Sequence, residues 1–481
     1  MGYHPGLEDD TFYLAAIKAD LNPALFPHDS DFFRLQFQAT VFDKLIAFSV
    51  HLSHLPLAWV VLLWQFAAIF AILHSCWRIS RRCFSQTVPR WASVGMIAAL
   101  LTLPVSGTDI NLGDQYLHPR MLATAAILAA VAYMLERRFW LAGFLLAIAF
   151  SIHALLGLLA ISFCAFLFWN LRSASPNWRF LTPMAGLLLP LGWVFAPASG
   201  AWHQAAATRS FYYLSNWTWY DWLGVYGPLA LLLAFRRFLK ARRGAAGESP
   251  ALLPLISSLF YYGVFQTIVG IAIMLPRGLE RLRPFEPMRY LHLLYFLFFL
   301  ILGGLLGQFV LRRHVYRWIL LFVPLGAGML YAQRQMYAAT EHIELPGAAS
   351  ENAWLQAFAW IRENTPVDSL FALDPHYMQL PGENYHGFRP LAERSVLADY
   401  VKDGGMAARV PPLAPRWLKE VNAQQDWKNF QAADFQRLHK DFGVTWVVLA
   451  RSDALGANEP DPSTGLTCLY ENRQVRVCRL Y

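Results

Sequence analysis

Long apolar stretches separated by short polar segments occupy the chain from residue 56 to residue 333. A helix that crosses a bilayer needs about 20 apolar residues, with a range of roughly 17–25. With the shorter stretches included, the pattern predicts ten membrane helices, at 56–77, 91–107, 119–135, 139–153, 154–171, 180–197, 222–236, 250–276, 290–311 and 317–333. The stretch 139–171 is also compatible with one long kinked helix, which would break the alternation of the loops.

The positions of Lys and Arg in the loops favour ten helices and a division of 139–171 into two. Every second loop is basic, and these loops carry 16 of the 22 basic residues of 56–333. Loops rich in Lys and Arg remain on the cytoplasmic side. The outer face then receives the tail from Arg334 and the segments 1–55, 107–118, 198–221 and 277–289.

The tail, residues 334–481, has no long apolar stretch and predicts a small soluble α/β domain. Its pattern predicts helices at 353–361 and 435–442, strands at 369–373 and 445–449, and a hairpin at 466–481. In that hairpin Cys468 and Cys478 are directly opposed. They either form a disulfide, which an oxidising outer face permits, or remain free in a small apolar core.

Residues 1–55 form a third region of mixed polarity, ahead of the membrane domain at 56–333. Apolar residues at 32–37 and 42–48 predict two short helices that lie at the membrane interface. No basic segment followed by an apolar core opens the sequence, so the pattern predicts no signal peptide.

The composition agrees with an α-helical polytopic membrane protein. Of the 481 residues, 56% are hydrophobic, against about 45–50% in an ordinary globular domain. The net charge is +8, and the basic excess is confined to 56–333, where 22 basic residues face 7 acidic ones. Since membrane loops explain that excess, no nucleic-acid partner is expected.

Three adjacent carboxylates, Glu8, Asp9 and Asp10, lie ahead of the first apolar stretch, followed by Tyr13. Like charges in a row repel one another, so such a cluster persists when it is solvated or when a cation or a catalytic task uses it. The alternative is a solvated helix N-terminus, where acidic side chains complement the helix dipole.

The outer loop at 107–118 holds two of the seven acidic residues of 56–333, Asp109 and Asp114, and leads into His118 and Arg120. Together with Asp9, these carboxylates could bind a divalent cation such as Mg²⁺ or Mn²⁺, which prefers oxygen ligands. The alternative is an ordinary polar loop with helix-capping Asp.

The outer loop at 277–289 is rich in arginine, on the side that should be poor in it. Its arginines are Arg277, Arg281, Arg283 and Arg289. Arginine makes planar bidentate bonds to phosphate, so a lipid phosphate is the natural ligand. The alternatives are pairing with Glu280 and Glu286, or snorkelling to lipid headgroups.

The outer loop at 198–221 and its border are crowded with aromatic residues, namely Trp202, Tyr212, Tyr213, Trp217, Trp219, Tyr220 and Trp222. An aromatic belt at the membrane interface explains most of them. Aromatic rings also stack on sugar rings, which is the second interpretation.

The sequence Asp9-Asp10-Thr11-Phe12-Tyr13 resembles the acidic-pair-x-x-Tyr element in the first outer loop of the GT-C glycosyltransferases. These polytopic enzymes use polyprenyl- or dolichyl-phosphate-linked sugars. In that superfamily a membrane helix precedes the acidic pair, and no such helix precedes Asp9 in this sequence. Either a helix lies upstream of Met1 or the acidic N-terminal segment crosses the membrane by itself.

The layout is similar over the whole chain, with interfacial helices after the acidic pair, alternating membrane helices, an acidic second outer loop and an arginine-bearing later loop. The segment 360–366 is similar to the opening of the outer C-terminal domain in many bacterial members. The closest likeness is to an uncharacterised bacterial family of this type.

The resemblance implies a GT-C-like fold and an inverting glycosyltransferase. Asp9 matches the catalytic base and Asp10 its partner. Residues expected to contact substrate are Tyr13, His118, Arg120, Arg277, Arg281, Arg283 and Arg289. The implied partners are a polyprenyl-phosphate-linked donor and the bilayer, and the implied location is the bacterial inner membrane with the C-terminal domain outside.

The competing interpretation is a transporter or lipid-binding membrane protein without covalent chemistry. In that case intramembrane charges would line a pathway. The predicted membrane helices contain almost no acidic residues, and the charges cluster in the outer loops. That distribution favours chemistry at a membrane surface.

Overall fold

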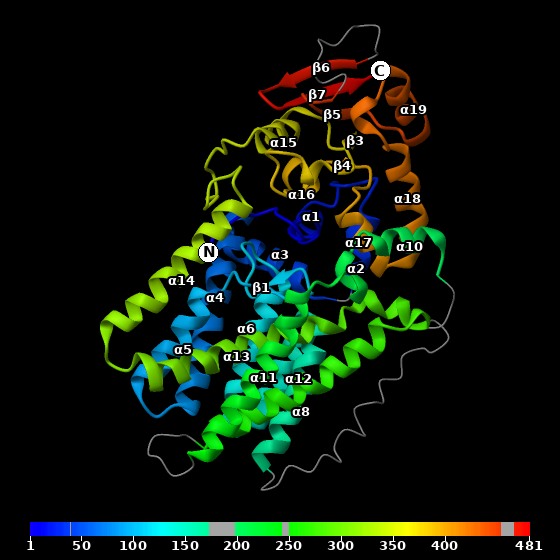
Figure 1. Ribbon diagram of the computed structural model, residues 1–481. Coiled ribbons are helices and arrows are strands. Elements are labelled where there is room, and N and C mark those ends of the chain that lie inside the picture. The colour runs from blue at the N-terminus through cyan, green and yellow to red at the C-terminus, as the bar shows by residue number, and fades with distance from the viewer. Residues whose placement is uncertain (39, 173–197, 243–249, 454–465) are drawn as a thin grey trace.

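The computed structural model describes residues 1–38, 40–172, 198–242, 250–453 and 466–481. The chain is mostly helical, and its long helices extend away from a mixed α/β region that contains the C-terminus (Figure 1). Six helices among the described residues are long and apolar enough to cross a bilayer. They are α4 (Leu57–Cys83), α8 (Ala154–Arg172), α11 (Trp219–Ala241), α12 (Leu252–Met274), α13 (Tyr290–Leu306) with its flanking turns, and α14 (Val315–Met336). The chain is therefore a multi-span membrane protein.

Three shorter helices also occupy predicted stretches, namely α5 (Thr87–Ala99), α6 (Pro119–Leu135) and α7 (Phe139–Ile152). Nine of the ten predicted stretches thus contain a helix, and the tenth, 180–197, lies outside the described residues. The stretch 91–107 differs most, because α5 ends at Ala99 and the chain then forms a small hairpin of β1 (Pro104–Val105) and β2 (Ile110–Asn111). Six helices meet the length criterion, so the count of ten stays a prediction.

The stretch 139–171 forms two helices, and the alternative of one kinked helix is wrong. Helix α7 ends at Ile152, and His153 caps it in an extended conformation before α8 begins. Carbonyls at the end of α7 lack partners within the helix. The backbone N–H of Val41 donates to the Ser151 carbonyl at 3.2 Å, and the Thr40 hydroxyl donates to the Ile152 carbonyl at 2.7 Å.

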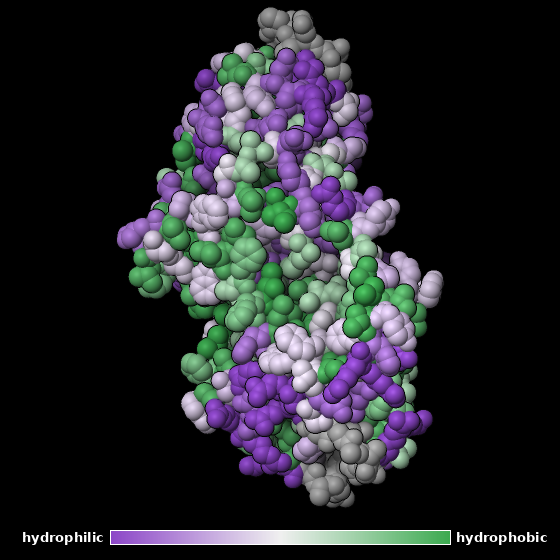
Figure 2. All heavy atoms as spheres, turned by 90° about the vertical axis from the view of Figure 1, so that its left-hand side faces the viewer, coloured by the Kyte–Doolittle hydropathy of each residue, from purple (hydrophilic) through white to green (hydrophobic). Residues whose placement is uncertain are grey.

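The predicted basic loops meet one another at the end of the helices that lies away from the α/β region. Helices α4, α8 and α11 all end there (Figure 1). Contacts that join these loops are Arg78 with the Glu136 carboxylate (2.7 Å), Arg137 with the Leu171 carbonyl (3.2 Å) and Arg242 over the Phe309 ring (5.5 Å). Figure 2 shows a band of apolar residues between this polar end and the polar α/β region.

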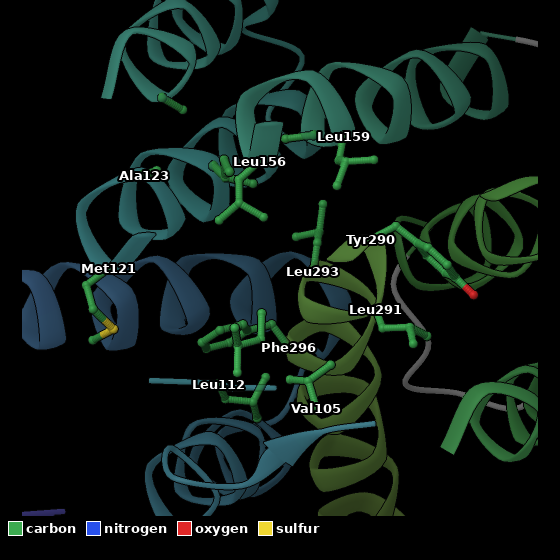
Figure 3. Packing of buried hydrophobic residues seen from close by; sticks show 14 of the residues in the cluster. Val105, Leu112, Met121, Ala123, Leu156, Leu159, Tyr290, Leu291, Leu293 and Phe296 are labelled. Carbon is green, nitrogen blue, oxygen red and sulfur yellow. The ribbon is translucent and has the colours of Figure 1, made fainter. Parts of the chain in front are cut away.

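Helix α13 forms the centre of the membrane region, because two thirds of the most apolar 18-residue stretch of 287–311 is buried. In Figure 3 its side chains Leu293 and Phe296 lie between the β1–β2 hairpin and helix α8, which contribute Val105, Leu112 and Leu159. Because α13 follows directly from the arginine-bearing loop, this packing fixes that loop relative to the other helices.

The α/β region contains a five-stranded mixed sheet in the order β4-β3-β5-β7-β6. Its strands are β3 (Leu370–Ala372), β4 (Ser395–Val396), β5 (Trp446–Ala450), β6 (Leu466–Glu471) and β7 (Val475–Leu480). Helix α15 (Ala353–Asn364) packs on the face that bears Trp446 and Val448, and α19 (Ala432–Phe442) packs on the face that bears Val447. The helices, strands and hairpin predicted for the tail are confirmed.

Cys468 and Cys478 pair across the β6–β7 hairpin and form a disulfide. The interpretation of these two residues as a bonded pair is thus confirmed. The other three cysteines, Cys76, Cys83 and Cys164, are free and buried.

The N-terminal segment lies between the membrane helices and the sheet. It forms α1 (Asp10–Leu21), α2 (Asp31–Phe37) and α3 (Phe42–Ser53). The two helices predicted at 32–37 and 42–48 are present, but Phe32, Phe33 and Phe42 are fully buried and pack inside the protein. Phe48 on α3 is 62% exposed and suits an interface.

The α/β region is joined to the rest of the protein by buried contacts. Tyr3 pairs with Ile343 in a β-bridge. Helices α17 (Lys402–Arg409) and α18 (Ala414–Ala423) pack on α10 (Gly200–Ala207), and their apolar residues belong to the same hydrophobic cluster as the membrane helices. The tail from 334 therefore does not have a core wholly of its own.

The disulfide leads to a prediction about thiol reactivity. Denatured, unreduced protein should react with a thiol reagent at the 3 free cysteines, and reduced protein at all 5, as counted by mass spectrometry. Reaction of Cys468 and Cys478 with the thiol reagent before reduction would contradict the disulfide. Persistence of the bond in cells requires an oxidising compartment, so protein labelled directly in cell lysate also reports on the side of the membrane.

Candidate functional site

All five segments predicted to share one face contribute to a single cavity of about 500 Å³, here called the central cavity. Its charged lining consists of Glu8, Asp9, Asp109, Asp114, Arg120, Arg209, Asp221, Arg289, Lys402 and Arg409. Five carboxylates and five cations therefore face one space, at the end of the membrane helices that lies toward the α/β region.

A second cavity of about 280 Å³, here called the arginine cavity, adjoins the first. Its polar lining is Asp9, Tyr13, Thr40, His118, His153, Arg281, Glu286, Arg289 and Arg409. Apolar residues, including Ile152, Leu155 and Phe285, supply much of the remainder. Asp9, Arg289 and Arg409 line both cavities and so lie at their junction.

Asp9 lies at the start of α1, and its two carboxylate oxygens have different surroundings. Oδ1 accepts a hydrogen bond from Nζ of Lys402 at 3.0 Å, and Lys402 also contacts the Glu8 carboxylate. Oδ2 lies 3.9 Å from Nε2 of His118, beyond hydrogen-bond range. Among the described residues Oδ2 has no hydrogen-bond donor, and it remains open to a ligand.

The cations near Asp9 determine its charge. Burial acts to raise the pKa of Asp9, but Lys402, then Arg209, His118 and Arg409, lower that pKa well below its usual value. The side chain is 24% exposed, and it lines the central cavity. The Asp9 carboxylate is therefore ionised at neutral pH.

Helix α17 carries both Lys402 and Arg409 to the site. Residues seven apart lie two turns apart on the same face of a helix. At Gly405 the backbone of α17 lies close to another segment, because a Cβ atom there would lie 2.3 Å from Nε of Arg209. The glycine thus lets α17 pack directly on the Arg209 side chain, which itself lines the central cavity.

Asp10 does not line the described cavities. Its Oδ2 accepts a hydrogen bond from the Gly6 backbone N–H at 2.7 Å, and the side chain is 2% exposed. Burial raises the pKa of Asp10 to about 7, against the opposing effect of that N–H. The structure therefore places Asp9 at the cavity and Asp10 in the turn behind it.

Tyr13 and His118 support the arginine cavity. Their rings pack edge to face with centroids 4.7 Å apart. His118 also caps α6, because its Nδ1 accepts from the Arg120 backbone N–H at 2.9 Å. Both predicted contact residues thus border the junction at Asp9.

The four arginines of the loop at 277–289 have different positions. Arg281 and Arg289 line the arginine cavity. Arg283 lies over the ring of Tyr213, 5.0 Å from its centroid, and Arg277 is exposed, and neither lines the described cavities. The predicted group of four is therefore reduced to two at the arginine cavity, of which Arg289 also lies at the junction.

Arg289 and Arg409 share one carboxylate. Arg289 pairs with Glu286, and Nη2 of Arg409 donates to Oε1 of Glu286 at 2.7 Å. Glu286 adopts a left-handed conformation with φ 49°, an uncommon state for a non-glycine residue. Counted over the whole arginine cavity, the three guanidinium groups of Arg281, Arg289 and Arg409 face the two carboxylates of Asp9 and Glu286. One positive charge is left in excess, which suits an anion.

The three carboxylates predicted as metal ligands each face a cation instead. Asp114 is bound by Arg120 through both oxygens, Asp9 by Lys402, and Asp109 lies 4.0 Å from Arg209. Among the described residues no three His, Cys, Asp or Glu side chains are grouped closely enough to hold a metal ion. The role of a divalent cation stays a prediction.

Sequence reasoning missed Lys402, Arg409 and Arg209. Lys402 and Arg409 lie in the tail, which the hydropathy pattern predicts as a separate soluble domain, and nothing in that pattern indicates that α17 returns to the membrane surface. The one available signal is the seven-residue spacing of two cations around a Gly-Gly pair at 404–405.

The fold and the site define a multi-span membrane protein with a charged cavity between its helix ends and an α/β region. Residues 352–408 match a family described as a domain of unknown function (DUF6798). A comparison with curated proteins gives no match. The matched stretch runs from the N-cap of α15 into α17, so it contains Lys402 and ends one residue before Arg409.

The contacts of Lys402 lead to a prediction about stability. Lys402→Met keeps most of the side-chain volume but leaves Glu8 and Asp9 without their cation. We expect a loss of about 1–3 kcal/mol at pH 7, less than for a fully buried pair because both carboxylates are partly exposed, Glu8 at 33% and Asp9 at 24%. Unfolding of the detergent-solubilised protein measures it, with the exposed Lys428→Met as control.

The same variant has an expected pH dependence. The pKa of Asp9 is lowered on folding, so the stabilisation by Lys402 is present above the unfolded pKa of about 4 and is lost as pH falls below it. The difference between wild type and Lys402→Met should therefore shrink from pH 7 to pH 3. An equal difference at both pH values would contradict the ion pair.

Proposed function

We propose that this protein transfers a sugar from a polyprenyl-phosphate-linked donor to an acceptor, on the extracytoplasmic face of a bacterial inner membrane. The observation that carries the proposal is the position of Asp9, an ionised carboxylate at the junction of a cavity with excess arginine and a second, more polar cavity. Transfer needs these two spaces, one for an anionic leaving group and one for an acceptor.

The donor phosphate is assigned to the arginine cavity. Arg281, Arg289 and Arg409 line it, and apolar residues from α7, α8 and the loop at 277–289 surround them. A phosphate bound there would be held by guanidinium groups, while the polyprenyl chain would leave toward the apolar helix surfaces. The arginines would also stabilise the negative charge that develops on the leaving phosphate.

The transfer itself is an inverting displacement. The acceptor hydroxyl loses its proton to Oδ2 of Asp9, its oxygen bonds to the anomeric carbon, and the bond from that carbon to the phosphate oxygen breaks. Polyprenyl phosphate is released. The low pKa of Asp9 makes it a weak base. We therefore expect the proton to be transferred late, after the acceptor oxygen has begun to bond to the oxocarbenium-like carbon and the hydroxyl has become more acidic.

The ten-helix topology belongs to this proposal. The basic loops gather at the end of the helices away from the cavities, as contacts such as Arg78 with Glu136 indicate. Assigning that end to the cytoplasm by the positive-inside rule places the cavities and the disulfide outside. A divalent cation remains part of the proposal only as an ion that the donor phosphate would carry into the site.

The competing function is transport or lipid binding without covalent change. The charges of the site lie at the helix ends and in loops, and a transport pathway would need them along the membrane helices. Release of polyprenyl phosphate from a labelled donor by purified protein supports transfer, whereas donor movement between leaflets of liposomes without cleavage supports transport.

Asp9→Asn is the first decisive variant. It keeps the shape of the side chain but removes the proton acceptor, so single-turnover transfer should fall by about 10²–10⁴-fold while donor binding is retained. Asp10→Asn is the matched comparison, because Asp10 bonds to Gly6 away from the cavity, and it should reduce transfer far less. Wild-type transfer by Asp9→Asn would refute the assignment of the base, and chelator treatment of both proteins reports any cation requirement.

Arginine-to-lysine changes test the phosphate site. Arg289→Lys and Arg409→Lys keep the charge but lose the bidentate fork, so binding of polyprenyl phosphate should weaken about tenfold. Arg277→Lys is the control, since Arg277 is exposed and lines none of the described cavities. Unchanged lipid binding in both junction variants would exclude the arginines as the phosphate site.

A further inference from the structure

A third cavity of about 460 Å³ continues from the central cavity, away from the arginine cavity. We call it the aromatic cavity, because its lining includes Phe211, Trp217, Tyr220 and Tyr385. It shares Glu8, Gly107, Asp109, Arg209, Phe211, Tyr220, Asp221, Tyr385 and Lys402 with the central cavity. A ligand in it would therefore reach the neighbourhood of Asp9, and the volume lies in the range of small-molecule sites, about 300–1,000 Å³.

The rest of the lining is rich in hydroxyl and amide groups. These residues are Thr108, Thr208, Ser210, Asn216, Thr218 and Gln379. Together with the aromatic rings they offer flat apolar faces beside many hydrogen-bonding groups. A sugar presents the complementary surface, with C–H faces that pack on rings and hydroxyls that donate and accept.

The charge of the aromatic cavity does not suit an anion. It is lined by three carboxylates, Glu8, Asp109 and Asp221, and two cations, Arg209 and Lys402. Lys402 already contacts two carboxylates. The excess is negative, opposite to that of the arginine cavity, so a phosphate or another acidic ligand would be repelled.

The wall of this cavity is held rigidly. Both oxygens of Asp221 are engaged: Oδ2 accepts from the Thr218 backbone N–H at 2.9 Å, and Oδ1 accepts from the Gly107 backbone N–H at 3.2 Å. Gly107 has φ 64°, and a Cβ there would lie 2.3 Å from the Trp217 ring. The β1–β2 turn is therefore locked against the indole and the start of α11.

Strained backbone gathers at the same wall. Glu8, Asp109 and Tyr385 have φ values of 54°, 52° and 64°, although none is glycine. Such conformations cost free energy and concentrate at ligand sites, where they aim particular side chains. At Asp109 this conformation leaves the carboxylate 64% exposed, where it lines both the central and the aromatic cavity.

We infer that the aromatic cavity binds a neutral saccharide, and that this saccharide is the acceptor of the transferred sugar. The acceptor role rests on the proposed function, whereas binding of the saccharide does not. Tyr220 supplies an exposed ring, Asp109 supplies a carboxylate for sugar hydroxyls, and the chain of the saccharide extends from the cavity mouth toward Asp9.

Binding of mannotriose, maltotriose and chitotriose to the purified full-length protein tests this inference, with saturation-transfer NMR as the readout. At least one of them should bind, and Tyr220→Ala and Asp109→Asn should each weaken it about tenfold. Both side chains are largely exposed, at 57% and 64%, so neither variant should unfold the protein. Trp219→Ala is the matched control, because Trp219 is the neighbouring aromatic, 75% exposed, and lines none of the described cavities.

The outcomes separate the inference from the proposed function. The saccharide site would be overturned if none of the three saccharides bound, or if Tyr220→Ala and Asp109→Asn both bound as tightly as wild type. Tighter binding of neutral peptides of similar size would overturn it as well. Saccharide binding that depends on Tyr220 and Asp109, in a protein that does not cleave a lipid-linked donor, would keep the site and remove the transfer. Arg409→Lys should leave saccharide binding unchanged, since Arg409 does not line the aromatic cavity.

Discussion

A buried arginine between two carboxylates determines where the candidate site forms. Arg389 bonds through Nε to Asp29 at 2.5 Å and through both terminal nitrogens to Asp403 at 2.8 Å, and all three side chains are at most 1% exposed. Removal of one member of such a group costs about 3–5 kcal/mol, because a charge is left unpaired in the interior. Asp29 belongs to the N-terminal segment and Asp403 to α17. The contact therefore fixes Lys402, the residue next to Asp403, over Asp9.

The three cavities differ in charge because different loops supply their walls. The loop at 277–289 brings two arginines and one glutamate to the arginine cavity, and α17 adds a third arginine. The loops at 107–118 and 198–221 bring carboxylates, aromatic rings and hydroxyl groups to the other side. Asp9 is where these two environments meet. A reaction between a phosphate-linked donor and a neutral acceptor needs this separation of charge.

Much of the architecture follows from local patterns in the sequence. The apolar stretches predicted nine of the observed helices, and the alternation of basic with less basic loops indicated which segments would meet. The hairpin was predictable from its pattern, but its register also depends on an irregularity between Cys468 and Tyr470, which brings Cys468 opposite Cys478. The presence of Asp9 and Arg289 at the site was also predictable, because the loop charges placed both of their segments at the same end of the helix bundle.

What could not be predicted depends on contacts between distant segments. Asp10 is equivalent to Asp9 in the sequence, and only the turn to Gly6 directs it away. Arg283 is only two residues from Arg281 in the same loop, yet its guanidinium group packs over the ring of Tyr213 from another loop. Lys402 depends on Arg389 and on the close packing of Gly405, neither of which leaves a local signature. Tertiary packing thus decides which members of a charged cluster face the cavity.

The order in which the chain is synthesised gives the Asp9–Lys402 contact a further meaning. The two residues are separated by 393 positions, and a ribosome adds about 5–20 residues per second. Asp9 therefore waits roughly 20–80 s, while the intervening helices are inserted, before its partner is made. Throughout that interval the Glu8 and Asp9 carboxylates lack the Lys402 ammonium group. The site is closed only by one of the last helices to emerge, so a chain that stops early in the tail is inserted in the membrane but never acquires its binding centre.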